Sequence, residues 1–88
     1  MDATEQVPRE LRWRSRRGMR ELDLLLTRWL ERRWPESTAE MQAAYSLLLE
    51  CEDDDLWDWL LGRCDPDSPR LHTLVRDIRA INDRDDAD

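Results

Sequence analysis

The sequence predicts an all-α protein, a compact bundle of about five short helices in a single domain. Leucine, isoleucine and tryptophan recur at the i, i+3, i+4 spacing that gives a helix one apolar face. No segment alternates apolar and polar residues with period two, and β-branched residues are few, so no strand is predicted. Proline, serine and glycine, which begin or end helices, separate the apolar stripes.

The first helix is expected over residues 8–16, with Pro8 at its first position, where the missing N–H would have no helical partner. The polar residues 1–7 before it are expected to fray. A second helix is expected from about Met19. It ends at Pro35, whose ring disfavours helical geometry in the preceding residue. The apolar stripe of the second helix comprises Leu22, Leu25, Leu26, Trp29 and Leu30, and Leu24 points away from it.

Ser37-Thr38-Ala39-Glu40 predicts a capping box at the start of a third helix, which ends near Cys51. The acidic run 52–55 opens a short fourth helix, where carboxylates satisfy free N–H groups and complement the helix dipole. This makes the run a solvated helix start. It lacks the central glycine and alternating ligands of an EF-hand. The two helices supply Met41, Ala44, Tyr45, Leu48, Leu49, Leu56, Trp59 and Leu60 to the core, with Trp57 and Leu61 on the flank and Gly62 as a C-cap.

A turn at residues 64–67 leads to a fifth helix, capped by Ser68 with Pro69 at its first position. The acidic tail 82–88 is expected to be disordered. The ordered core is therefore expected over about residues 8–82 of a single domain spanning residues 1–88. The apolar stripe of the fifth helix comprises Leu71, Leu74, Val75, Ile78 and Ile81.

Charge is unevenly distributed along the 88 residues, whose formal net charge is -7. Residues 9–33 carry nine arginines and four carboxylates, a net charge of +5, whereas residues 36–67 carry ten carboxylates and one arginine, a net charge of −9. The acidic total argues against nucleic-acid binding, for which a basic domain is expected. The basic N-terminal third remains suited to a phosphate-bearing partner or an acidic protein surface.

The residue types of an active site do not gather into a recognisable motif. Cys51, Cys64 and His72 lack metal-ligand spacing, and there is neither a GxGxxG nor a P-loop sequence. A binding role is therefore expected in place of an enzymatic one, with no metal site. No apolar run approaches the ~18–20 residues of a membrane span, and the first residues lack a signal peptide. These features predict a cytoplasmic protein without membrane insertion, whose two cysteines are free thiols.

The stretch Arg17-Gly18-Met19-Arg20-Glu21 lies between two strongly helical segments. Glycine can take a positive φ at a helix end without a Cβ penalty, and it leaves the backbone bare for the close approach of another molecule. Alternatively, Gly18 is only the C′ cap of the first helix and its charged neighbours are solvated. The local sequence alone favours this second interpretation.

Two stretches in the same order resemble the succinate dehydrogenase flavinylation-factor family, SdhE. Trp13 followed by residues 16–23, RRGMRELD, carries the family's RGxxE pattern at Arg17, Gly18 and Glu21. Residues 48–60, LLECEDDDLWDWL, are similar to the family's LLE-acidic-DL-aromatic-x-W-L segment. The resemblance spans about residues 8–82. One departure is Trp57, which stands where the family often has phenylalanine.

The resemblance implies a five-helix bundle that acts as a monomeric, cytoplasmic assembly factor and is not an enzyme. Such factors promote covalent attachment of FAD to the flavoprotein subunit of succinate dehydrogenase, and often of fumarate reductase. The flavoprotein attaches its own FAD, so this chain is not expected to bind the cofactor stably.

The resemblance also places a partner-binding site around the RGxxE pattern. Arg17 is expected to pair with a carboxylate or polar backbone of the flavoprotein, Gly18 to permit close approach, and Glu21 to accept hydrogen bonds. The second stretch is expected to be structural, with no part in binding. A polar rim and an aromatic anchor complete the predicted set, since Trp and Arg are common hot-spot residues: Arg16, Arg20, Asp23 and Trp13.

Two other interpretations stay open. Members of this family have been described as the antitoxin partner of a membrane toxin, which would make the chain a binding module of another class. A small DNA-binding regulator is the weaker alternative, because it needs a basic recognition helix and only the first two helices are basic.

Overall fold

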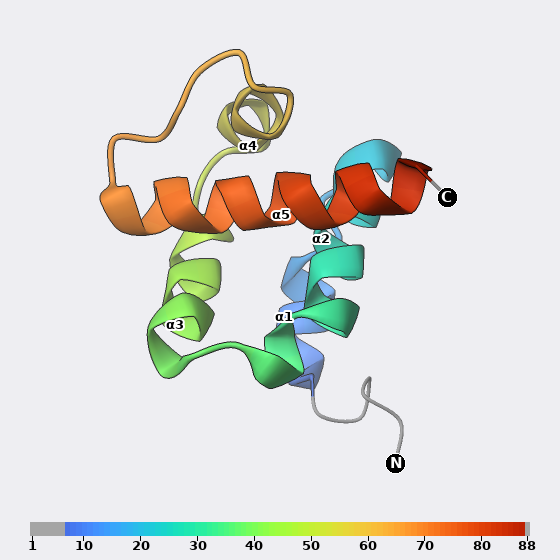
Figure 1. The fold of residues 1–88 in the computed structure, drawn as a ribbon. Helices are drawn as coiled ribbons and strands as arrows, with labels where there is room; N and C mark the ends of the chain where they lie inside the picture. The colour runs from blue at the N-terminus through green and yellow to red at the C-terminus, as the bar shows by residue number, and fades with distance from the viewer. Residues whose placement is uncertain (1–6, 88) are drawn as a thin grey trace.

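Five α-helices and one short 3₁₀ helix make up the part of the chain that the computed structural model describes, residues 7–87 (Figure 1). No strand occurs in this range, so the all-α prediction is confirmed. The elements in chain order are α1 (Arg9–Arg14), α2 (Arg20–Arg32), η2 (Trp34–Glu36), α3 (Ala39–Leu48), α4 (Asp53–Leu60) and α5 (Pro69–Ala87).

Helix α5 is the element on which α2, α3 and α4 pack. It crosses these helices in Figure 1, where it runs horizontally across the view. Its predicted stripe faces inward: Leu74 and Ile78 are fully buried, whereas Leu71 at the helix start is partly exposed. Helix α2 supplies the opposing apolar face, with Leu22, Leu26, Trp29 and Leu30 buried.

Aromatic rings fill the centre of the bundle. Trp29 and Tyr45 are stacked with ring centroids 4.8 Å apart, and Trp34 meets both edge-on. The polar atoms of Trp29 and Tyr45 have partners: Trp29 Nε1 donates to Asp77 Oδ2 at 2.8 Å, and the Tyr45 hydroxyl lies 2.7 Å from Ser15 Oγ. Because buried polar groups are costly without partners, these bonds allow large amphipathic rings to fill a core that lacks phenylalanine.

Helix α1 is shorter than predicted. Pro8 precedes it as the N-cap, and the helix ends at Arg14 with Ser15 as the C-cap. Ser15 Oγ donates to the carbonyl of Leu11 at 2.6 Å, which, with its contact to Tyr45, ties this end into the core. Gly18 lies three residues beyond Ser15, in the linker to α2. The interpretation of Gly18 as the C′ cap of the first helix is therefore wrong.

The start of α3 differs from the predicted capping box by one residue. Thr38 is the N-cap, and its Oγ1 accepts from the backbone N–H of Met41 at 3.1 Å. Ser37 instead donates to the carbonyl of Arg33 at 2.6 Å, closing the turn that contains η2. Either hydroxyl could cap α3, but that of Ser37 is bonded to Arg33 at the end of α2, which leaves Thr38 as the cap.

The last helix is longer than predicted. The tail was expected to be disordered from Asn82, but α5 continues to Ala87. Asn82 is buried, and its Nδ2 donates to the carbonyls of Leu25 at 3.2 Å and Ile78 at 2.8 Å. This amide fastens the helix to α2 where the apolar stripe ends. Val7 is buried as well, whereas the expected fraying of residues 1–6 and the fate of Asp88 lie outside the described residues.

Candidate functional site

Arg17 points inward from the α1–α2 linker to the junction between α3 and α4. Its Nε donates to Asp53 Oδ1, its Nη1 to the carbonyl of Leu49 and its Nη2 to the carbonyl of Cys51, each at 2.7 Å. The side chain is only 16% exposed. The last carbonyls of a helix have no partner within the helix. Arg17 satisfies those at the end of α3, and its planar fork can bind several acceptors at once.

A second contact fixes the same linker from the α2 side. Asp23, in the first turn of α2, accepts a hydrogen bond from the backbone N–H of Arg17 at 2.5 Å. With a further bond from Nη1 to the carbonyl of Arg14 at 3.3 Å, Arg17 is held by α1, α2 and the α3–α4 junction. Arg17 and Asp23 therefore have positioning roles within this chain. Their predicted direct contact with a partner stays a prediction.

Asp53 holds Arg17 in place, a role that was not predicted from the sequence. The acidic run was expected to be a solvated helix start, yet the Asp53 carboxylate forms the ion pair with Arg17, and the N-cap Glu52 makes no side-chain cap bond. The expectation is wrong for Asp53 because the Arg17 fork lies beside the start of α4. The available signal was the pairing of an arginine-rich and an acidic stretch, but nothing local selects this carboxylate from its neighbours.

Gly18 follows this anchored arginine with φ at +91°. L-residues rarely adopt such a φ, so glycine is favoured here for its backbone. Among the described residues, no heavy atom beyond its chain neighbours lies within 4 Å of the position that a Cβ would take. In this part of the chain the space beside Gly18 is therefore open, and its backbone is bare to an approaching molecule.

The remaining predicted contact residues are all exposed on the surface. Trp13 is 69% exposed, which answers whether it belongs to the core or to the surface. It lines a shallow depression with Arg9 and Arg12 of α1 and with Arg16 of the α1–α2 linker. A large aromatic side chain that lies outside the core of a small protein is a candidate interaction residue. The exposed members of the predicted set, together called the motif surface, are Trp13, Arg16, Gly18, Arg20 and Glu21.

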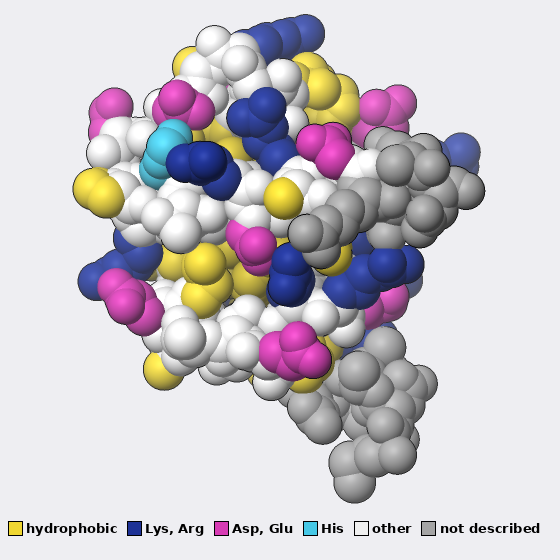
Figure 2. Space-filling view, viewed as in Figure 1, with side chains coloured by type: hydrophobic (Ala, Val, Ile, Leu, Met, Phe, Trp, Pro, Cys, Tyr) yellow, Lys and Arg dark blue, Asp and Glu magenta, His cyan; other side chains and the backbone are white. Residues whose placement is uncertain are grey.

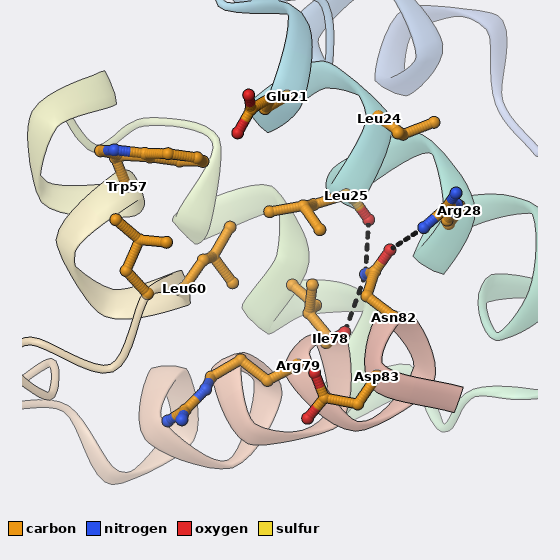
Figure 3. Close-up of a pocket in the computed structure, with 11 residues that line it drawn as sticks. Glu21, Leu24, Leu25, Arg28, Trp57, Leu60, Ile78, Arg79, Asn82 and Asp83 are labelled. Atoms are coloured by element: carbon orange, nitrogen blue, oxygen red, sulfur yellow. Dashed lines mark hydrogen bonds between the residues drawn. The ribbon is translucent and has the colours of Figure 1, made fainter. Parts of the chain in front are cut away.

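A groove of about 370 Å³ opens beside Glu21, between α2, α4 and α5 (Figure 3). Its walls are largely apolar and include Leu25, Trp57 and Leu60. This groove was not predicted from the sequence. Its signals were the residues placed off the core stripes, Leu24, Trp57 and Leu61, which the fold brings around one opening.

The cysteines and the potential metal ligands do not form a further site in the described part of the chain. Both cysteines are free thiols, and burial together with the negative charge of Asp55 raises the pKa of Cys51. Within residues 7–87, no three metal-ligating side chains gather at one place. No helix in the described part of the chain has the length and apolar character needed to cross a membrane.

The fold and its surface define a small helical bundle that presents a shaped turn, an exposed tryptophan and an open groove, features typical of a protein-binding module. Comparison with known proteins shows the family to which this module belongs. The chain belongs to the family described as flavinator of succinate dehydrogenase, whose family model matches residues 9–82. The family resemblance inferred from the two sequence stretches is thereby confirmed.

Several relatives carry the name FAD assembly factor SdhE. The protein of Xylella fastidiosa strain 9a5c is 44% identical over 72 residues, which cover 82% of this chain and 74% of the relative. The Pseudomonas aeruginosa protein is 43% identical over 76 residues, covering 86% and 90%. The Coxiella burnetii protein is 36% identical over 74 residues, covering 84% and 90%. No solved structure matches the chain.

Proposed function

We propose that this chain is an assembly factor that binds the flavoprotein subunit of succinate dehydrogenase and promotes its covalent flavinylation with FAD. The observation that carries the proposal is membership of the flavinator family over residues 9–82. The proposal includes fumarate reductase as a second partner, a monomeric state and a cytoplasmic location. It assigns bond formation to the flavoprotein, so that this chain holds no FAD stably and is not an enzyme.

The geometry supports a docking role for the motif surface. Arg17 fixes the linker through carbonyl groups and a carboxylate of its own chain, so Gly18 and Glu21 keep their positions before any partner arrives. A surface that is already ordered loses less conformational entropy on binding, which favours affinity. The bare backbone at Gly18 allows close approach, and the exposed Glu21 carboxylate offers an acceptor one turn into α2.

The proposal is tested by in-gel flavin fluorescence of the denatured flavoprotein from cells that lack this gene. We expect covalent flavin to be lost on deletion, restored by the wild-type chain and poorly restored by Glu21→Ala. Glu31→Ala is the matched control, because it removes the same exposed side chain from the other end of α2. It should restore flavin fully.

Unchanged covalent flavin in the deletion strain would overturn the proposal. Equal rescue by Glu21→Ala and the wild type would keep the assembly role but remove Glu21 from the docking surface. Circular dichroism of the purified variants separates a lost contact from a lost fold.

A further inference from the structure

The groove between α2, α4 and α5 holds a carboxylate and an aromatic ring at one opening. We propose that it receives an arginine or lysine side chain of the flavoprotein, recognised by the Glu21 carboxylate and the Trp57 ring. The inference rests on the proposed function, which supplies the partner. It adds the chemistry of the contact, and it gives the second sequence stretch, expected to be structural, a part in binding through Trp57.

The size of the groove suits one long side chain. Its volume of about 370 Å³ lies near the lower end of the ~300–1,000 Å³ of small-molecule pockets, too small for a docked helix. Leu25, Leu60 and Ile78 line it with aliphatic groups (Figure 3). Arginine and lysine bury their aliphatic stems along apolar surface while keeping the charged head near a polar partner. The groove offers such a wall and such a partner.

Glu21 supplies the charge for this contact. Its side chain extends over the groove between Trp57 and Leu25 in Figure 3. Among the described residues it has no hydrogen bond or ion pair, so its carboxylate is available to a cation. The indole of Trp57 is partly exposed in the same opening, and the face of a tryptophan ring is the aromatic surface that attracts a cation best.

Two arginines also line the groove, and their positions decide where a cation fits. Arg28 Nη1 donates to Asn82 Oδ1 at 3.3 Å, away from the Trp57 side. The Arg79 guanidinium lies against Gly62, where a Cβ would come within 2.8 Å of its Nη2. Figure 3 shows Asp83 beside Arg79, at the α5 side of the groove. Arg28 and Arg79 therefore both lie away from Glu21, at different sides of the groove, and the opening at Glu21 and Trp57 favours a basic group.

The groove also adjoins the motif surface, because Glu21 belongs to both. A partner that covers Gly18 and Glu21 therefore reaches the groove without a second docking site. Leu24 and Leu61, 48% and 45% exposed, widen the apolar area at its mouth and are suited to pack against the backbone that carries the basic side chain.

Binding of the full-length chain to the purified flavoprotein subunit, measured by titration calorimetry, tests the inference. Glu21→Gln removes the charge and keeps the shape. Trp57→Leu removes the ring face and keeps an apolar wall. We expect each to weaken binding about tenfold. Because both groups hold the same cation, the double variant should fall well short of the hundredfold loss expected from independent sites.

A pair of leucines provides the control. Leu61 and Leu47 are both 45% exposed, but Leu61 lines the groove and Leu47 lies on α3 outside it. Leu61→Ala removes apolar area at the mouth and should weaken binding, whereas Leu47→Ala should bind as the wild type does. Circular dichroism and thermal melts establish that each variant is folded, so that reduced binding reports the groove.

A photo-crosslink identifies the occupant. Benzoylphenylalanine placed at position 61 should capture a flavoprotein peptide that contains arginine or lysine. Replacing that basic residue with methionine should weaken wild-type binding and leave Glu21→Gln binding almost unchanged. Capture of a second copy of this chain, or of a peptide without a basic residue, would overturn the inference. Folded Glu21→Gln and Trp57→Leu variants that bind like wild type would do the same.

The two proposals fail in different ways. If the wild-type chain neither binds the flavoprotein nor restores covalent flavin, the proposed function is wrong. The inference about the groove is then wrong as well, because the flavoprotein was its proposed partner. If the wild-type chain does both, and the groove variants match it, only the inference about the groove fails.

Discussion

Tyr45 places a polar hydroxyl group inside the bundle. It is fully buried against Trp29, and its hydroxyl meets Ser15 Oγ inside the bundle. Burial raises the pKa of Tyr45 above its ordinary value, because the phenolate would have to exist without solvent. The hydrogen bond between Tyr45 and Ser15 and the positive charge of Arg17 offset this only in part. The ring joins α3 to α2, and its hydroxyl joins α3 to the end of α1.

This environment predicts an alkaline limit on stability. The raised folded-state pKa of Tyr45 contributes stability that is fully present below the unfolded tyrosine pKa of about 10 and is lost as the pH rises toward the folded-state value. The substitution Tyr45→Phe should lower the free energy of unfolding by about 1 kcal/mol at neutral pH. Above about pH 10, the variant should lose less stability than the wild type does. Urea unfolding followed by tryptophan fluorescence measures both, and parallel pH curves for the two proteins would contradict the expectation.

At the scale of the elements, the α1–α2 linker is held by contacts that the helices themselves do not make. Arg17 reaches 32 to 36 residues along the chain, to the end of α3 and the start of α4. One guanidinium therefore sets the position of Gly18 relative to three helices. The linker depends on the geometry of the arginine fork as well as on its charge.

Arg17→Lys tests this dependence because it keeps the charge and removes the fork. A single ammonium cannot reach Asp53 and both carbonyls in the same way, so unfolding should become easier by about 1–3 kcal/mol. Amide hydrogen exchange should quicken across residues 16–21. Arg16→Lys, at the exposed neighbouring position, is the control and should leave both measurements unchanged.

The elements also show how far sequence reasoning reaches. The stripes of α2 and α5 were predicted because helical periodicity is local and Leu26 or Ile78 has no alternative but the core. Helix ends were less predictable: Ser37 and Thr38 could both cap α3, and the Arg33 carbonyl decided between them. The tail was misjudged because Asn82, a polar residue, is fastened by backbone carbonyls of α2 and α5.

The candidate site, too, was predicted from the sequence only in part. The prominence of Gly18 followed from its position between two helical stretches, and its positive φ agrees with the reason given for a glycine there. The inward turn of Arg17 could not be predicted, because three of its acceptors, on Leu49, Cys51 and Asp53, lie more than thirty residues away. The groove escaped prediction because Leu24 and Trp57 lie on different helices, and only the packing of α2 and of α4 on α5 brings them to one opening.

At the scale of the whole molecule, one helix supports a small bundle that measures 38 × 29 × 24 Å. Figure 2 shows basic and acidic side chains interspersed over one face, with small apolar areas between them. A protein of 88 residues has a small hydrophobic core, so each buried side chain of α5 contributes a large share of the total stability.

Leu74→Ala measures that share. Leu74 is fully buried in α5 and lies outside the groove, so its truncation should cost about 2–5 kcal/mol, against a total of roughly 5–15 kcal/mol for a typical domain. The thermal midpoint should fall by about 10 °C or more. Thr73→Ala, at the exposed adjacent position, should change unfolding by no more than about 0.5 kcal/mol. Similar melting of both variants would show that α5 is not the support described above.

The reach of Arg17 also sets the order of events while the protein is being made. Its acceptors at Leu49, Cys51 and Asp53 are synthesised after the turn that they hold. A nascent chain that has only just displayed Gly18 and Glu21 has none of them yet. The turn therefore takes its final shape only after α3 and the start of α4 have left the ribosome. A fragment ending before α4 would carry the full RGxxE sequence without the geometry of its surface.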